Sequence, residues 1–117
     1  MTRKRWVLGI LLAIVMGPGK IWADDTIEQV AFTDMDQMLF DARQAFRQRH
    51  YDVAITTCEK ILRKDPDQIA ALKIMGSGYY MLEEYERARH VWTYALQIAP
   101  DDPDIPQYMK RLPEPTK

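Results

Sequence analysis

Residues that could do chemistry are scarce in this chain of 117 residues, which has two His, one Cys, one Ser and no Asn. His50 and His90 form no His-x3-His pair and are accompanied by no acidic triplet, and solvated His is the commoner role. Ser77 has no base at a helical spacing, so no hydrolytic triad is predicted. The single Cys58 excludes an intramolecular disulfide and a Cys-paired zinc or haem site. We therefore expect no catalytic residue, no metal, no cofactor and no enzyme.

Three further motifs have simple structural interpretations. Gly76-Ser77-Gly78 is not followed by the Lys of a phosphate-binding loop. The acidic run at residues 83–86 falls where a helix begins, and acidic residues are ordinary there. Cys58 lies in a core register, which favours a small buried side chain over a reactive thiol.

The N-terminal segment, positions 1–23, has the layout of a secretory signal peptide. Basic residues at positions 3–5 precede an apolar run at 6–16, a Gly-Pro-Gly break follows, and Ala23 precedes Asp24. The apolar run would be about 16 Å long as a helix, roughly half of the hydrocarbon thickness. The alternative is an uncleaved inner-membrane anchor at residues 6–16. Either way the rest of the chain is expected to be exported, and the periplasm is the predicted compartment.

The net charge differs between the N-terminal segment and the rest of the chain. Residues 1–23 hold four basic residues and no acidic ones, so residues 24–117 carry a net charge of −5. A nucleic-acid-binding domain is usually basic, so we expect no nucleic-acid partner. Membrane contact is expected only through an uncleaved signal.

The remaining chain matches itself when positions 35–68 are aligned with positions 69–102. Small, aromatic and Pro residues recur at this 34-residue spacing, which together with helical patterning indicates a helix–turn–helix repeat. The matched pairs are Ala42 and Gly76, Tyr51 and Tyr85, Ala54 and Ala88, Leu62 and Leu96, and Pro66 and Pro100.

The second copy resembles the tetratricopeptide repeat (TPR) family, whose pattern is Trp, Leu-Gly and Tyr on one helix, then Ala and Phe, then Pro. Leu72, Met75 and Trp92 replace the family's Trp, Leu and Phe with other apolar residues. The resemblance covers residues 35–102. Its signature positions are Ala42, Tyr51, Ala54, Cys58, Pro66, Leu72, Met75, Gly76, Tyr79, Tyr85, Ala88, Trp92, Ala95 and Pro100.

The resemblance implies an all-α fold, a fragment of a right-handed α-solenoid with two repeats at residues 35–68 and 69–102. Apolar stripes at helical spacing support helices over 35–48 and 53–62, and around residues 72–79 and 88–96. A capping helix is expected within residues 103–112. A lead-in segment (24–34) and a flexible tail (113–117) complete the expected organisation.

The family's architecture implies a concave groove lined by the first helix of each repeat. The expected groove residues combine apolar anchors with three cations, which suits a peptide or helix bearing apolar side chains and a few carboxylates. They are Leu39, Phe40, Arg43, Phe46, Arg47, Lys73, Ile74, Ser77, Tyr80 and Met81.

The expected function is therefore that of a non-catalytic adaptor in the cell envelope that binds a protein or peptide. Two repeats are fewer than the three that such arrays normally need. The first alternative is accordingly a structural module that self-associates into a homo-oligomer through its open repeat ends. The second is an assembly factor or chaperone for envelope, secretion, pilus or cytochrome machinery.

Overall fold

The structure, a computed structural model, describes residues 34–115. The predicted signal peptide and nearly all of the predicted lead-in segment lie outside these residues. The described chain is helical throughout and contains no strand, which confirms the predicted all-helical class. None of its helices is long and apolar enough to cross a membrane. A first helix occupies residues 34–47 and is followed by α2 (Tyr51–Lys64), α3 (Ile69–Met81), α4 (Tyr85–Ile98) and α5 (Asp104–Lys110).

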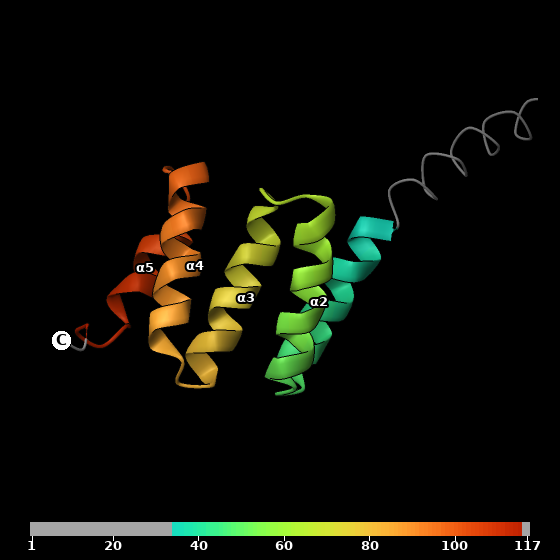
Figure 1. Cartoon of the computed structure of the whole chain (residues 1–117), viewed down its shortest axis with the longest axis horizontal. Coiled ribbons are helices and arrows are strands. Elements are labelled where there is room, and N and C mark those ends of the chain that lie inside the picture. The colour runs from blue at the N-terminus through green and yellow to red at the C-terminus, as the bar shows by residue number, and fades with distance from the viewer. Residues whose placement is uncertain (1–33, 116–117) are drawn as a thin grey trace, which may run out of the picture. The chain divides into compact units, whose positions relative to one another are not determined.

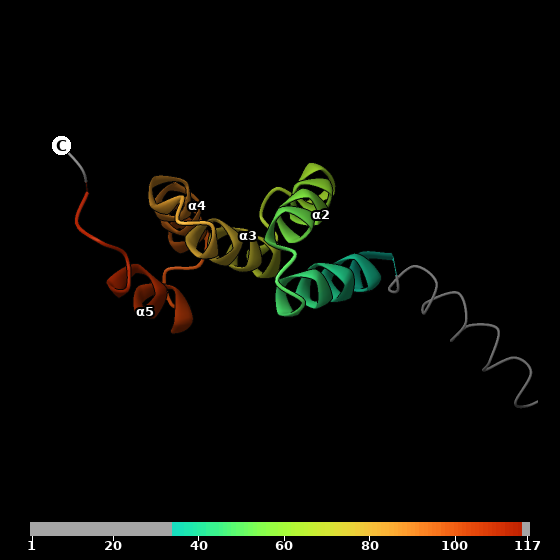
Figure 2. The same ribbon diagram turned by 90° about the horizontal axis from the view of Figure 1, so that it is seen from below.

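Each helix packs against its neighbour in the sequence and runs in the opposite direction (Figure 1). The view along the helices shows α2 and α4 on one side, and the first helix, α3 and α5 on the other (Figure 2). The first helix and α5 flank α3 on that second side. This arrangement places three helices, far apart in sequence, around one face of the unit formed by Met35–Lys117.

The repeat spacing of the sequence reappears in the packing of aromatic rings. Phe46 and Tyr51 meet edge to face with centroids 5.3 Å apart and planes at 65°. Tyr80 and Tyr85, which occupy the equivalent positions of the second repeat, meet at 5.5 Å and 64°. Each pair joins the end of one helix to the start of the next. The same kind of ring contact therefore closes both helical hairpins.

The turns of the two hairpins also share a backbone conformation. Arg49 and Glu83 have φ angles of 65° and 62°, in the left-handed region that usually holds Gly. The N–H of His50 donates to the carbonyl of Ala45 at 2.9 Å, and the N–H of Glu84 donates to that of Tyr79 at 2.9 Å. Both helices therefore end in the same hydrogen-bonded motif, with a charged residue at its left-handed position.

Two apolar clusters join the helices. One contains Leu39, Ala42, Cys58, Ile61 and Ala71, and connects the first helix with α2 and α3. The other connects α3, α4 and α5. Its buried members are Leu72, Ala88, Val91, Trp92, Ala95 and Ile105.

Trp92 of the second cluster lies directly against the backbone of Gly76. A Cβ atom at Gly76 would clash with the indole Nε1 and would lie 2.5 Å from Cδ1 and 2.8 Å from Cε2. Trp92 is 2% exposed. The absence of a side chain at Gly76 thus allows α3 and α4 to enclose the largest buried side chain of the described residues.

The first prediction concerns this contact. Gly76→Leu should force the indole ring or α4 to move, and overpacking of this kind costs about 1–3 kcal/mol. For a unit of this size each kcal/mol lowers the melting temperature by roughly 4–8 °C. Thermal unfolding followed by circular dichroism measures the change.

Phe40→Ala is the matched control, because the side chain of Phe40 is 50% exposed. Its melting temperature should stay within a few degrees of the parent. A protein in which Phe40→Ala is the more damaging change would contradict this assignment of the core.

The second prediction concerns Cys58, which is fully buried in α2. Burial, with a smaller contribution from the neighbouring Glu59, raises the pKa of the Cys58 thiol to about 12. Because the thiolate is the reactive form, Cys58 should label slowly in the folded protein and fully in denaturant. Labelling followed by mass spectrometry tests this, and rapid labelling of the folded protein would place Cys58 at the surface.

Candidate binding groove

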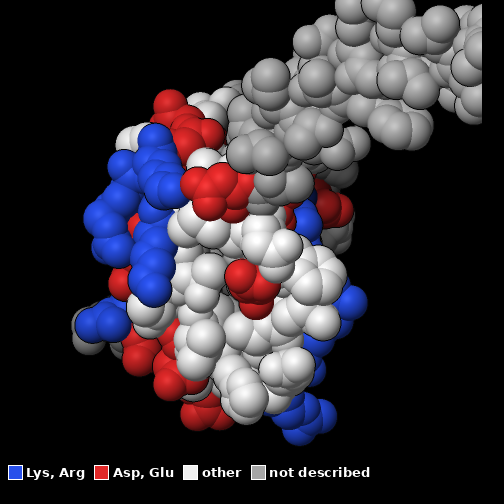
Figure 3. Space-filling model, turned by 90° about the vertical axis from the view of Figure 1, so that its right-hand side faces the viewer, with Lys and Arg blue, Asp and Glu red and all other residues white. Residues whose placement is uncertain are grey.

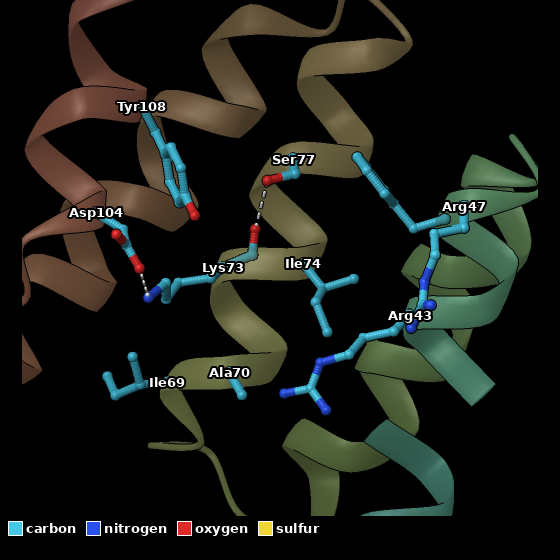
Figure 4. A pocket seen from close by; sticks show the side chains of 10 residues that line it. Arg43, Arg47, Ile69, Ala70, Lys73, Ile74, Ser77, Asp104 and Tyr108 are labelled. Atoms are coloured by element: carbon cyan, nitrogen blue, oxygen red, sulfur yellow. Dashed lines mark hydrogen bonds and ion pairs between the residues drawn. The ribbon is translucent and has the colours of Figure 1, made fainter. Parts of the chain in front are cut away.

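A groove of about 460 Å³ lies on the face shared by the first helix, α3 and α5. Helix α3 forms its floor, the first helix one wall and α5 the other (Figure 4). Ile69, Ala70 and Ile74 make the floor apolar. The full lining consists of Arg43, Phe46, Arg47, Ile69, Ala70, Lys73, Ile74, Ser77, Asp104 and Tyr108.

The first helix brings two cations to the groove. Arg43 and Arg47 lie one turn apart on the same helix and are both exposed. Neither forms an ion pair with any residue between 34 and 115. These guanidinium groups are therefore available to an anionic group beside the apolar floor.

Lys73 has a different role from the two arginines. Its Nζ lies 3.1 Å from Asp102 Oδ2 and 2.7 Å from Asp104 Oδ2. Burial by itself would lower the pKa of the Lys73 ammonium, but hydrogen bonds and attraction from these two carboxylates raise it instead. Lys73 lines the groove as expected, but its charge is already paired with Asp102 and Asp104.

Asp102 also fixes the start of α5. Its Oδ1 accepts hydrogen bonds from the backbone N–H groups of Asp104 at 2.9 Å and Ile105 at 3.2 Å. Burial alone would raise the pKa of the Asp102 carboxyl, but these two N–H groups and the Lys73 ammonium lower it overall. The Lys73–Asp102 contact thus ties the groove wall formed by α5 to the floor formed by α3.

Tyr108 completes the wall and connects it with the core. Its ring lies 5.3 Å from that of Trp92, measured between centroids. On the other side Ser77 Oγ donates to the Lys73 carbonyl at 2.8 Å, so the Ser77 hydroxyl is turned back onto its own helix.

Six of the ten expected groove residues line this groove, namely Arg43, Phe46, Arg47, Lys73, Ile74 and Ser77. The expectation for Leu39 is corrected, because it is 7% exposed and belongs to the core cluster with Ala42. Phe40 and Met81 are exposed but do not line the groove. Tyr80 packs instead against Tyr85 and Trp92.

Sequence reasoning missed four lining residues, Ile69, Ala70, Asp104 and Tyr108. The repeat register contained a signal for two of them. Asp104 and Tyr108 lie one repeat period after Ala70 and Ile74. Extending the repeat comparison beyond residue 102 would have shown that α5 occupies the place of α3 in a further repeat, and is therefore a wall of the groove as well as a cap.

No group of three or more His, Cys, Asp or Glu side chains suited to a metal ion occurs within residues 34–115. No model of a known protein family matches the chain.

The third prediction concerns the tie between α3 and α5. Asp102→Asn keeps an oxygen for the α5 N–H groups but removes the charge that faces Lys73, so it should lower the stability by about 1 kcal/mol near neutral pH. Thermal unfolding measures this loss. The neighbouring Asp101→Asn is the matched control, because Asp101 is exposed and its side chain has no partner among the described residues.

The pH dependence of the parent protein has a defined sign. The pKa of Asp102 is lower in the folded protein than its ordinary value of 3.8. Its contribution is therefore complete above that value and is lost as the pH falls through the lower, folded-state pKa. The melting temperature of Asp102→Asn should fall less on acidification than that of the parent. Equal acid sensitivity would show that Asp102 does not contribute.

Proposed function

We propose that this chain is a non-catalytic protein-interaction module of the tetratricopeptide type, in which the groove binds a peptide or helix. The recurrence of ring contacts and turns at the repeat spacing supports the repeat assignment. The observation that carries the binding proposal is the pair of arginines, Arg43 and Arg47, that have no ion-pair partner among the described residues and lie beside an apolar floor.

The proposed ligand is a segment with apolar side chains and carboxylates one helical turn apart. Its apolar side chains would cover Ala70 and Ile74, and its carboxylates would face Arg43 and Arg47. Removal of apolar surface from water supplies affinity, and the charged pairs fix the register of the ligand. On the opposite wall Asp104 is already paired with Lys73. The two arginines of the first helix therefore determine the charge that the groove prefers in its ligand.

Export is a further part of the proposal. The basic residues and apolar run of positions 3–16 support it, and the periplasm is the compartment that we propose. An adaptor or an assembly factor in the envelope would both use a groove of this chemistry.

The fourth prediction tests the groove by exchanging charges across it. The probe is a set of designed helical peptides with Leu on one face and two Glu residues four positions apart, paired with versions in which Lys replaces Glu. Arg43→Glu combined with Arg47→Glu should weaken binding of the Glu peptides at least about tenfold, which corresponds to about 1.4 kcal/mol. Fluorescence anisotropy measures the dissociation constants.

The same double variant should gain affinity for the Lys peptides, which a merely damaged protein would not do. Lys60→Glu is the control, because Lys60 is exposed on α2 and away from the groove. Equal binding of Glu and Lys peptides by the parent protein would contradict the proposed ligand class.

A further inference from the structure

The two helical turns at one edge of the molecule carry opposite charges. The first turn joins the first helix to α2, the second joins α3 to α4, and both lie at the lower edge in Figure 1. Residues 47–50 of the first turn read Arg-Gln-Arg-His, whereas residues 81–84 of the second read Met-Leu-Glu-Glu. All eight residues are exposed.

The charged residues of the two turns correspond position by position in the repeat register. Arg49 and Glu83 occupy equivalent positions and share the left-handed backbone conformation. Neither side chain has a partner among residues 34–115. Glu84 has only an exposed contact with Arg87, at 3.1 Å. Gly would adopt this backbone conformation more readily than either charged residue.

Exposed apolar surface lies beside the acidic turn. Met81 and Leu82 are 46% and 43% exposed, and they precede Glu83 directly. The corresponding residues of the basic turn are Arg47 and Gln48. The long aliphatic part of an arginine can cover an apolar side chain while its head remains available for an anion. The basic turn can therefore pair its charges with those of the acidic turn and cover the apolar side chains beside it.

We propose that this edge is the interface of a homodimer, in which the basic turn of one copy packs against the acidic turn of a second copy. A two-fold axis between the turns would form each contact twice, because both turns occupy the same edge of one chain. Arg49 of each copy would pair with Glu83 of the other, and Arg47 would lie over Met81 and Leu82. Within one chain Arg49 and Glu83 form no ion pair with each other.

This interface differs from an end-to-end contact between repeats. The end formed by the first helix and α2 shows a mostly uncharged central area, with Lys and Arg side chains at its left and right margins and Asp and Glu side chains above, below and within it (Figure 3). The proposed dimer uses the two turns rather than this end. The dimer proposal does not rest on the proposed peptide-binding function, because the groove and the turns use different residues except for Arg47.

Reversing the charge of one turn at a time tests the proposal. One variant combines Arg49→Glu with His50→Glu and makes both turns acidic. The other combines Glu83→Arg with Glu84→His and makes both turns basic. Each new pair of residues already occupies the same backbone conformation in the other turn, so both variants should fold. Arg43 and Arg47 are unchanged, so peptide binding measured in parallel reports on the groove separately.

Sedimentation equilibrium of the purified protein at low ionic strength should show dimers that weaken as salt is added. Each double variant should raise the dimer dissociation constant at least about tenfold. An equimolar mixture of the two variants should form a heterodimer, and the protein with all four substitutions should regain the homodimer.

A parent protein that is monomeric at every concentration would overturn the proposal. Dimers that persist in both double variants would also overturn it and would move the interface to another surface, such as the open end. Failure of the mixture and of the fourfold variant to associate would show that the charges do not pair across the interface. Circular dichroism confirms in each case that the variants are folded.

Discussion

The packing of Trp92 against the bare backbone of Gly76 is the contact on which the second half of the structure depends. It brings α3 and α4 together around a buried indole ring, and that ring also packs against Tyr108 of α5. Since α5 is a short helix of seven residues, its own hydrogen bonds contribute little to its stability. Its position follows from this aromatic contact and from the buried Ile105.

The Lys73–Asp102 contact holds α5 against α3 in addition to the aromatic packing. Asp102 accepts two backbone N–H groups of α5 and faces the Lys73 ammonium of α3. A groove exists only if its two walls stay in place relative to its floor. The same contact removes Lys73 from the cations available to a ligand, so the charge of the groove is concentrated on Arg43 and Arg47 at the opposite wall.

The two repeats share their backbone geometry but differ in their exposed residues. Equivalent rings and equivalent turns recur in the second repeat with nearly the same geometry. At the exposed turn positions, however, Arg49 is replaced by Glu83. Buried positions are constrained by packing against their neighbours, whereas exposed positions are not, so the two turns can carry opposite charges on the same framework.

The sequence by itself determined the helical class, the repeat period and the core positions of Ala42, Ala54 and Trp92, because helical periodicity and residue size depend on local order along the chain. The family resemblance, rather than periodicity, pointed to six of the groove residues. Only the tertiary structure decided the charge of the groove. Lys73 meets Asp102 across 29 residues of sequence, and a contact of that separation leaves no trace in periodicity. Leu39 lies on the apolar stripe of the first helix and is buried in the cluster with Ala42, so the groove position that the family resemblance implied for it does not hold in the tertiary structure.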